Sequence, residues 1–576
     1  MLTEGFISPA TGWVSSAEIL TASCPILLAR PPKQLTKKGK ERKMFIPLLA
    51  TDFMKRAVSQ YGKKIGVVDG DMHFTYAQFG ERVNRLSNAL VAMGVQKGDR
   101  VGVIDMNTHR LLELHFGVPQ IGAILLPINI RLSPREISYV LKDSGTRVLV
   151  INEDLAGLVE KANLKGIEHT IILKGDGTGT FPADIAGTDY ERMLEQASPV
   201  LEQDFGLDEN DPAEMFYTSG TSGNPKGMLL THRMLWLAAT KDLFNGVAAA
   251  NDRIVYLQAI PLFHANCWRK AHMITGVGGR HVMLRQFRPD LVCELIAREK
   301  VTYVELVPTM ADTLTQFKDL DRYDLSSIER IVLGGAPLLS GTQEALIKKF
   351  PWCMINSGYG MSETASCGTT AHLKDYLTGL SPEERKRLQR CQGIEDMLTR
   401  VRVVDSQGRD VKADGKEMGE IIMRGHSVID GYWHLPDETS KTIVGGWLYS
   451  GDIATMNEDR YITIVDRKKD IIISGGENIG SVEVENVISS HPAVAEVAVV
   501  AAPHEKWGET PVAFIVLAAG CTLTADDVIA HCRKKELSPF KIPRTIEFRE
   551  ALPKGGTGKI LKSELKRPLW EKNNLN

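Results

Sequence analysis

The stretch Tyr217-Thr-Ser-Gly-Thr-Ser-Gly-Asn-Pro-Lys-Gly227 sets the expectation for the fold and the site of this chain. Its glycines let backbone N–H groups approach an anion closely, and its hydroxyl side chains add further donors. Lys226 supplies a compact positive charge whose three donors can point at phosphate oxygens. The stretch is not a Walker A loop, because Pro225 precedes Lys226 and Gly227 follows it where that pattern needs Ser or Thr. We interpret it as a phosphate-binding loop of another kind; a flexible Gly/Ser turn is the alternative.

Length and composition indicate a globular protein of more than one domain. The 576 residues exceed the usual size of a single domain, and a hydrophobic content of 43% indicates an ample core. Lys and Arg number 69 against 71 Asp and Glu, and this net charge of -2 argues against bulk electrostatic binding of nucleic acid.

The cysteines and the hydropathy pattern predict a cytoplasmic protein. The 8 cysteines are scattered without a Cys-x-x-Cys pair, so we expect neither disulfides nor a zinc site. No uncharged apolar run reaches the ~18 residues that a membrane helix needs.

The first 43 residues differ from the remainder of the chain. Residues 20–30 are mildly apolar and precede the basic segment 33–43, which is the reverse of the order in a signal peptide. We hypothesise that translation begins at Met44 and that residues 1–43 are a disordered or non-native extension.

Strands that alternate with helices predict an α/β fold. Short apolar runs at 100–105, 147–151, 255–257, 301–306 and 331–333 are typical of buried strands, and 79–93 and 231–244 have helical spacing. Beyond Val401 short strands and turns predominate, and the charge cluster Asp466-Arg-Lys-Lys-Asp470 separates two apolar strands. We expect a large domain over 44–468, with layered, mostly parallel sheets and a β-rich subdomain, and a small mobile α+β domain over 469–576.

Local signals place two helix starts and one loop. Ser133 is expected to cap a helix that has Pro134 at its first position, and Ser381 with Glu384 forms the pattern of a capping box before a charged surface helix. Residues 171–190 are rich in Gly, Thr and Asp and are expected to form a loop.

Further motifs follow the opening stretch in an order that resembles the acyl-adenylate-forming superfamily. This group includes acyl-CoA synthetases, luciferases and the adenylation domains of peptide synthetases, and the resemblance runs from about residue 44 to about residue 566. The motifs are Pro261-Leu-Phe-His264 with Asn266 and Trp268, Gly334-Gly-Ala-Pro337, Gly358-Tyr-Gly-Met-Ser-Glu363, Tyr449-Ser-Gly-Asp452, Asp466-Arg467, Ser474-Gly-Gly-Glu-Asn-Ile479 and Pro553-Lys-Gly-Gly-Thr-Gly-Lys559.

The resemblance implies a nucleotide site. In it, Tyr359 stacks on adenine, Asp452 and Arg467 hold the ribose, and Ser362, which replaces the family's threonine, lies at the α-phosphate. The implied residues that bind ATP or AMP are Thr218, Ser219, Gly220, Thr221, Ser222, Gly223, Lys226, Gly335, Ala336, Pro337, Tyr359, Gly360, Met361, Ser362, Asp452, Arg467 and Lys559.

The resemblance also implies the catalytic groups. They are Lys226, His264, Ser362, Glu363 and Lys559. Glu363 is the expected Mg²⁺ ligand, which suits a metal that prefers few carboxylates together with substrate phosphates. Lys559 is expected to bridge the attacking carboxylate and the α-phosphate.

An acyl pocket and a CoA path complete the expected site. His264, Asn266 and Trp268 are expected at the acyl pocket, with Trp268 as its gate; a core histidine and a core aromatic are the alternatives. Ser474, Gly475, Gly476 and Glu477 are expected to contact CoA after the small domain turns about Lys469, the hinge, and a purely structural turn is the alternative.

These expectations combine into an ATP-dependent acyl-CoA synthetase that uses ATP, Mg²⁺ and CoA and acts on medium- or long-chain fatty acids. Synthetases for an aromatic or alicyclic acid, a luciferase-like oxygenase and a nucleotide-binding homologue without turnover are the alternatives. No carrier domain follows Lys559, which disfavours loading of a carrier protein. A homodimer is left open.

Overall fold

The computed structural model describes residues 46–175, 177, 186–218, 224–244, 251–365, 367–377, 379–555 and 559–571, apart from the side chains of 242, 244 and 265–268. The expected extension, residues 1–43, therefore lies outside the described part, as do residues 219–223 of the opening stretch. Residues 47–576 form one compact unit.

The first sheet has seven strands in the order β7-β6-β5-β3-β4-β8-β9. All of its pairs are parallel except β8 with β9, an antiparallel pair in which Thr218 lies opposite Lys226. The two ends of the phosphate-loop stretch are thus brought together by a hairpin. Its strands are β3 (Arg100–Ile104), β4 (Ile124–Pro127), β5 (Thr146–Asn152), β6 (His169–Leu173), β7 (Thr188–Asp189), β8 (Pro212–Thr218) and β9 (Lys226–Thr231).

The second sheet has nine strands in the order β16-β15-β14-β13-β12-β10-β11-β1-β2, and its central pairs are parallel. The loops after β12, β13 and β14 consequently leave from the same edge. Its strands are β1 (Ile65–Asp69), β2 (Met72–Thr75), β10 (Val255–Gln258), β11 (Arg280–Met283), β12 (Tyr303–Leu306), β13 (Arg330–Leu333), β14 (Met354–Tyr359), β15 (Thr369–Thr370) and β16 (Ile394–Glu395).

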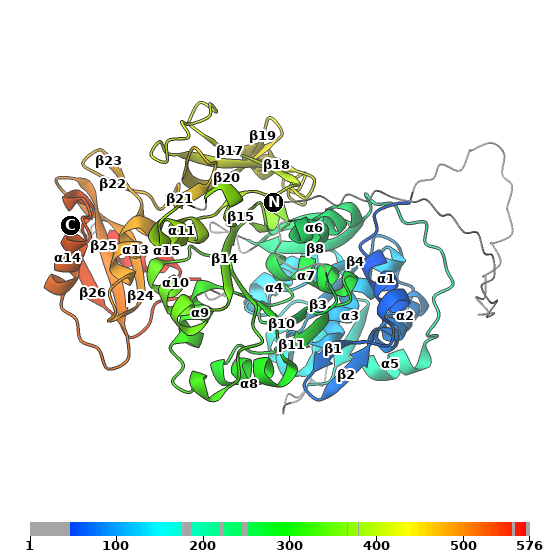
Figure 1. Ribbon diagram of the computed structural model, residues 1–576. Coiled ribbons are helices and arrows are strands. Elements are labelled where there is room, and N and C mark those ends of the chain that lie inside the picture. The colour runs from blue at the N-terminus through cyan, green and yellow to red at the C-terminus, as the bar shows by residue number, and fades with distance from the viewer. Residues whose placement is uncertain are drawn as a thin grey trace, which may run out of the picture. The chain divides into compact units, whose positions relative to one another are not determined.

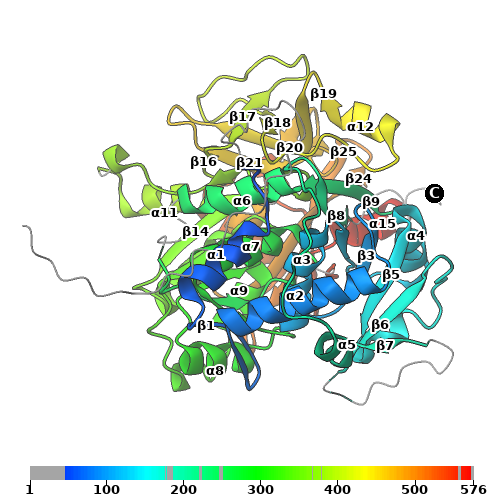
Figure 2. The same cartoon turned by 90° about the vertical axis from the view of Figure 1, so that its right-hand side faces the viewer.

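Helices cover both sheets (Figures 1 and 2). One core cluster joins Phe79 and Leu86 of α2 and Leu112 of α3 to Val101 of the first sheet and Val67 of the second, so α2 and α3 pack between the two sheets. The helices up to residue 390 are α1 (Asp52–Tyr61), α2 (Tyr76–Ala92), α3 (His109–Gly117), α4 (Pro134–Ser144), α5 (Tyr190–Gln196), α6 (His232–Phe244), α7 (Ala265–Gly276), α8 (Pro289–Glu299), α9 (Pro308–Thr315), α10 (Ser340–Lys349) and α11 (Pro382–Arg390). Short 3-10 turns are η1 (Pro119–Ile121), η2 (Glu153–Leu158), η3 (Leu320–Arg322), η4 (Ser362–Thr364), η5 (Asp375–Leu377) and η6 (Pro539–Lys541).

The third sheet is antiparallel and forms the β-rich region. A short helix, α12, lies between β18 and β19 in the sequence. Asp452 of β20 lies opposite Arg467 of β21, which matters for the site below. Its elements are β17 (Thr399–Val404), β18 (Gly419–Gly425), α12 (Pro436–Thr442), β19 (Ile443–Val444), β20 (Trp447–Met456) and β21 (Ile462–Arg467).

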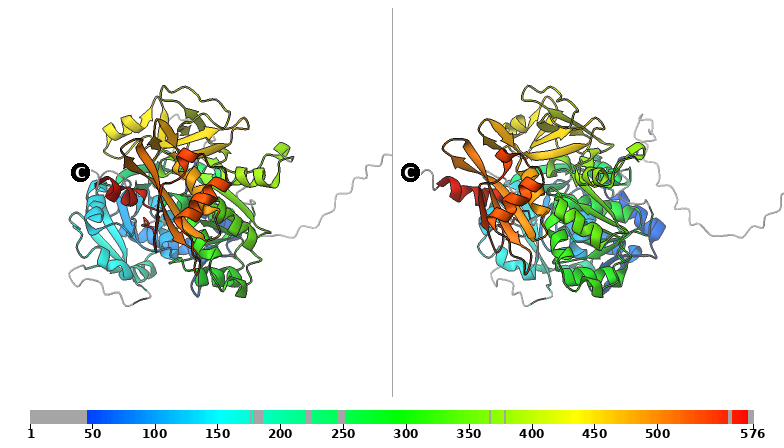
Figure 3. Two further views of the ribbon diagram at one scale, coloured as in Figure 1. Left: turned by 90° about the vertical axis from the view of Figure 1, so that its left-hand side faces the viewer. Right: turned by 60° about the vertical axis from the view of Figure 1, so that its left-hand side comes forward.

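The fourth sheet begins after the charge cluster and has the order β23-β22-β25-β24, with β26 beside β25 (Figure 3). Val484 of α13 and Val528 of α14 pack on one face through Val497, whereas Leu565 of α15 packs on the other through Ala498. Its elements are β22 (Ile472–Ser474), β23 (Glu477–Ile479), α13 (Ser481–Ser489), β24 (Val494–His504), β25 (Gly508–Leu517), α14 (Ala525–Lys534), β26 (Thr545–Phe548) and α15 (Lys562–Glu571).

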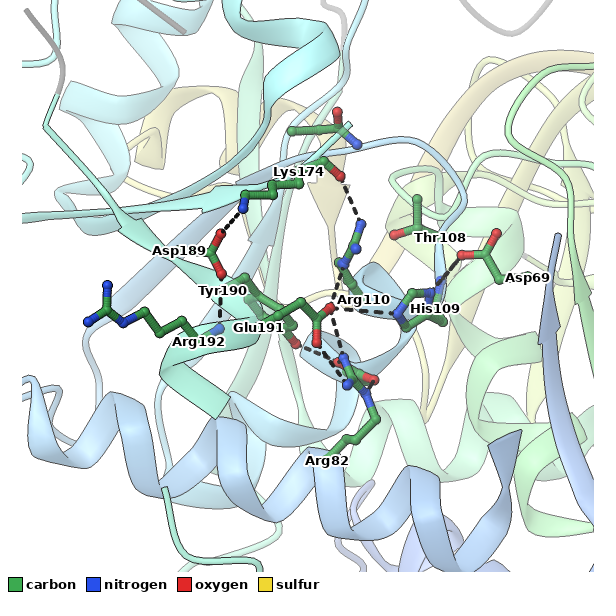
Figure 4. A network of polar contacts seen from close by, with 12 residues as sticks. Asp69, Arg82, Thr108, His109, Arg110, Lys174, Asp189, Tyr190, Glu191 and Arg192 are labelled. Carbon is green, nitrogen blue, oxygen red and sulfur yellow. Dashed lines mark hydrogen bonds and ion pairs between the residues drawn. The ribbon is translucent and has the colours of Figure 1, made fainter. Parts of the chain in front are cut away.

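A network of charges around the buried Glu113 connects three helices that pack on the large sheets (Figure 4). Arg82 of α2 forms ion pairs with Glu113 of α3 and Glu191 of α5, and the Tyr190 hydroxyl donates to Glu113 over 2.6 Å. Burial raises the pKa of Tyr190 well above its usual value, so its phenol remains a donor. Because removal of one partner would strand a buried charge, the network holds α2, α3 and α5 in one register.

The expected α/β class with a β-rich region is confirmed, and so are both helix starts. Ser133 and Ser381 each accept from the backbone three residues on, and each belongs to a capping box. The loop expected over 171–190 is wrong at both ends: 171–173 pair with β5 and 188–189 pair with β6. The Gly, Thr and Asp residues between these strands gave the whole segment the composition of a loop, so the strand ends were not predicted. Residues 176 and 178–185 lie outside the described part.

Candidate active site

A cavity of about 850 Å³ lies where the loops after the parallel strands meet residues of β20 and β21 and the segments that follow β21 and β26. Many of the expected site residues line it. They are His264, Gly335, Ala336, Pro337, Tyr359, Gly360, Met361, Asp452, Arg467, Lys469 and Lys559. Gly335 has a φ of 79°, a conformation that suits glycine and lets the backbone turn directly after β13. The volume is sufficient for a nucleotide together with part of a second substrate.

The expected ribose clamp is assembled by strand pairing. The Arg467 Nε lies 3.1 Å from Asp452 Oδ1, and the Tyr359 hydroxyl donates to Asp452 Oδ2 over 2.7 Å. Burial and the Asp452 charge raise the pKa of Tyr359 well above its usual value. A carboxylate held in this way can accept hydrogen bonds from two vicinal hydroxyls, and the ring of Tyr359 forms part of the cavity wall beside it.

His264 presents a neutral imidazole to the cavity. It directly precedes α7, and burial, with a smaller contribution from the Arg131 charge, lowers its pKa to about 4. Its Nε2 is buried and makes no hydrogen bond among the described residues. A neutral ring of this kind can contact a substrate carboxylate without adding charge.

Lys559 reaches the cavity from the far end of the chain. Burial and then the Arg467 charge lower its pKa to about 8, with Asp452 opposing the shift. Gly555, at the other described end of the same loop, accepts a hydrogen bond of 3.2 Å from Arg131 Nη1. In this arrangement the terminal segment therefore lies against the large sheets with its lysine at the cavity.

Lys226 and Glu363 are expected site residues that do not line the described cavity. Lys226 begins β9, and its Nζ lies 2.7 Å from Glu438 Oε2. Hydrogen bonds from Lys226 and Lys441 hold the pKa of Glu438 at about 2. Glu363 follows Ser362 in η4, is buried, and accepts a hydrogen bond of 2.8 Å from the Tyr432 hydroxyl.

The donor set at Glu363 fits a magnesium ion. Carboxylate oxygens are hard ligands, and Mg²⁺ is bound by one or two of them together with substrate phosphates. Tyr432 occupies Oε1 of Glu363, and Oε2 is the second oxygen that could reach a metal. Glu363 is thus the residue that would hold Mg²⁺ beside a bound triphosphate.

Several expected residues are not brought to the cavity, or fall outside the description. Ser474, Gly475, Gly476 and Glu477 form the turn between β22 and β23, and the described lining does not include them. Gly475 and Gly476 have φ of 61° and 88°, which a two-residue hairpin turn requires. Ser219, Gly220, Thr221, Ser222 and Gly223 lie outside the described residues, as do the side chains of Asn266 and Trp268 in the first turn of α7.

Sequence reasoning missed Tyr432 and Glu438. Both contact expected catalytic groups, although 69 residues separate Tyr432 from Glu363 and 212 separate Glu438 from Lys226. Nothing in the segment around them indicates that contact, since a glycine, an aromatic pair and a helix that starts with proline are typical of any surface turn.

The fold and the cavity are those of an adenylate-forming enzyme. A profile described as "AMP-binding enzyme" matches residues 54–433, and one described as "AMP-binding enzyme C-terminal domain" matches residues 483–559. The chain belongs to the AMP-binding enzyme family, so the resemblance inferred from the motifs is confirmed.

Three similar proteins illustrate the range of the family. The chain is 34% identical to the peroxisomal trans-cinnamate:CoA ligase of Petunia hybrida, over 91% of this chain and 94% of that one. It is 35% identical to a long-chain-fatty-acid–CoA ligase of Thermus thermophilus, over 89% and 94%. The crystal structure of the anthranilate CoA ligase AuaEII in complex with anthranoyl-AMP superposes with a TM-score of 0.82 at 26% identity, over 92% and 99%.

Among the described helices, none combines the length and the apolar character that a membrane crossing requires. The expected cytoplasmic location stays a prediction, since one of these relatives is named as peroxisomal.

Lys559 predicts a pH dependence. Its charge is present below a pKa of about 8 and is lost as the pH rises through that value, so kcat/KM for ATP in adenylate formation should fall above pH ~8. Lys559→Arg keeps its positive charge at all working pH values. We therefore expect its kcat/KM for ATP to be lower than in the wild type but not to fall further above pH ~8. An unchanged limb in the arginine variant would assign it to another group.

Proposed function

We propose that this chain is an AMP-forming acyl-CoA ligase whose acid is a medium- or long-chain fatty acid. The observation that carries the ligase assignment is the cavity in which Lys559 meets Tyr359, the Asp452–Arg467 pair and His264. ATP, Mg²⁺ and CoA serve the reaction together with the acid. The fatty-acid assignment is supported by the motif His264-x-Asn266-x-Trp268 and by the identity to the Thermus thermophilus ligase.

In the first half-reaction the substrate carboxylate attacks the α-phosphorus of ATP, and pyrophosphate leaves. Two anions must approach each other, so the main task of the protein is neutralisation of charge and alignment. Lys559 is the cation at the attacking carboxylate, Lys226 is the cation at the departing phosphates, and Asp452 with Arg467 holds the ribose. Mg²⁺ on Glu363, when bound, would neutralise further phosphate charge.

In the second half-reaction the thiol of CoA attacks the acyl carbon, the bond to the phosphate oxygen breaks, and AMP leaves. No side-chain nucleophile is needed in either step. The turn 474–477 is away from the cavity here while Lys559 is at it, which supports a rotation about Lys469 that exchanges the two. The division into 44–468 and 469–576 is part of this proposal.

A compact aromatic acid is the second candidate. A cavity of about 40 Å³ beside Gly335 and Gly360 is lined by the charged side chains of Arg269 and Glu305 as well as by Val332. Charged walls favour a short or polar acyl group over a long alkyl chain. The trans-cinnamate and anthranilate ligases among the similar proteins agree with this alternative.

A panel of acids separates the two candidates. Butyrate, octanoate, palmitate, cinnamate and anthranilate should each be tested for AMP release that depends on both ATP and CoA. We expect the highest kcat/KM with octanoate or palmitate; a maximum with cinnamate or anthranilate would establish the second candidate. AMP release without a thioester product would contradict the ligase assignment, and oxygen consumption would indicate the luciferase-like alternative.

Lys559 should serve only the first half-reaction, because rotation would carry it away from the cavity. Lys559→Ala is expected to slow adenylate formation by roughly 100-fold or more, the loss typical of one electrostatic group in an active site. Conversion of supplied acyl-adenylate to acyl-CoA should proceed near the wild-type rate. Equal losses in both half-reactions would refute this division of labour.

Lys469 should tolerate substitution unless rotation is blocked. Proline fixes φ at about -65° and should block rotation about this residue. Lys469→Pro is therefore expected to retain adenylate formation and to lose CoA transfer. Lys469→Ala, which leaves the backbone free, is the matched control and should retain both. CoA transfer at the wild-type rate in the proline variant would place the hinge elsewhere.

A further inference from the structure

Four charged or polar side chains from three segments of the chain form one continuous series of contacts. Glu438 of α12 pairs with Lys226 of β9, whose Nζ lies 5.0 Å from the centroid of the Tyr432 ring. The Tyr432 hydroxyl in turn donates to Oε1 of Glu363 over 2.8 Å. The second and third of these three contacts connect Lys226, the lysine proposed to lie at the phosphates, with Glu363, the carboxylate proposed to hold the metal, through one tyrosine side chain.

The backbone fixes this chain at both ends. The Trp433 N–H donates to the carbonyl of Gly227, next to Lys226, and the Ile429 N–H donates to the carbonyl of Glu363, over 2.8 and 2.9 Å. The Tyr432 N–H donates to Thr439 Oγ1 over 2.9 Å, which ties the loop to the helix that carries Glu438. Residues 429–439 thus bridge two catalytic segments that are far apart in sequence.

These contacts restrict groups that would otherwise rotate freely. A lysine has four rotatable bonds, and an aromatic face on one side with a carboxylate on the other limits the positions of its ammonium. A carboxylate that accepts one hydrogen bond is limited in its rotation as well. Glu438 also places a negative charge where a phosphate oxygen would bind Lys226.

Building on the proposed function, we propose that Tyr432 and Glu438 are positioning residues for the nucleotide and its metal. Tyr432 orients Glu363 for Mg²⁺, and Glu438 holds the Lys226 ammonium until a phosphate of ATP replaces it. Glu438 therefore improves alignment but competes with the nucleotide. These two roles predict opposite effects on binding and on turnover, which a purely structural role would not produce.

Glu438→Gln tests the competition. We expect ATP to bind about fivefold more tightly by calorimetry in EDTA, the size of one exposed ion pair, while kcat for adenylate formation falls. Lys441→Met is the matched control: Lys441 is the other partner of Glu438, at 2.9 Å and largely exposed, and its loss should change neither value. Unchanged or weaker ATP binding in Glu438→Gln would overturn the competing role.

Tyr432→Phe tests the proposal that Tyr432 orients Glu363 for the metal ion. The substitution removes the hydroxyl and leaves the aromatic ring beside Lys226 in place. In the presence of ATP, Mn²⁺ should bind roughly tenfold more weakly by electron paramagnetic resonance, the loss expected for a hydrogen bond to a charged group. ATP binding in EDTA should remain as in the wild type. Tyr376→Phe removes a similar bond to Asp459 at the surface and is the control that should alter neither measurement.

The outcomes separate this inference from the proposed function. If Tyr432→Phe weakens both metal-free ATP binding and Mn²⁺ binding, Tyr432 has a structural role and does not position the metal ligand. A large fall in the melting temperature of this variant would lead to the same conclusion. Wild-type protein that binds no ATP at all would refute the proposed function. If the wild-type protein binds ATP and Mn²⁺, and Glu438→Gln and Tyr432→Phe give the same values as the wild type, only the positioning roles are refuted.

Discussion

Parallel pairing of β12, β13 and β14 is the constraint on which the site depends. Parallel strands end at the same edge of a sheet, so the residues that follow Leu306, Leu333 and Tyr359 are neighbours in space. The antiparallel hairpin of β8 and β9 fixes the position of Lys226 in a different way, through the register that sets it opposite Thr218, and Lys226 is not part of the described cavity lining. The chemistry can therefore draw on distant segments because backbone hydrogen bonds, rather than side chains, bring them together.

Two cationic side chains, Arg467 and Lys559, line the cavity together, and their repulsion would be offset by a bound anion. Burial lowers the pKa of Lys559 most, the like charge of Arg467 lowers it further, and Asp452 opposes the shift in part. Phosphate groups would offset both cations at once, so nucleotide binding and the seating of the terminal segment favour each other. Arg131 donates to the carbonyl of Gly555, which adds a contact to that seating, and its charge also contributes to the lowered pKa of His264.

Sequence patterns predicted what local chemistry determines. Capping at Ser133 and Ser381 follows from a hydroxyl and a carboxylate three residues apart, and the alternation of strands and helices follows from hydropathy alone. Tyr432 and Glu438 could not be predicted, since their roles arise only from contacts across the fold. Glycines 475 and 476 fit both a turn and a close approach to a ligand, and the positive φ values supply a reason for them that needs no ligand.

The large and the small cavity share part of their lining, since Gly335, Gly358, Tyr359 and Gly360 border both. The large cavity is lined from the loops after β13 and β14 and from the third sheet, among other segments, whereas the small cavity beside Gly335 is bounded in addition by Arg269 of α7 and Glu305 of β12. Arg269 and Glu305 line the small cavity and not the large one, whereas Asp452 and Arg467 line only the large one, so substitutions at the first pair can change the charge of the small cavity while the Asp452–Arg467 pair keeps its geometry. The similar proteins include ligases named for trans-cinnamate and for long-chain fatty acids, and under the proposed function Arg269 of α7 and Glu305 of β12 are the charged positions at which a choice between such acids would be tested.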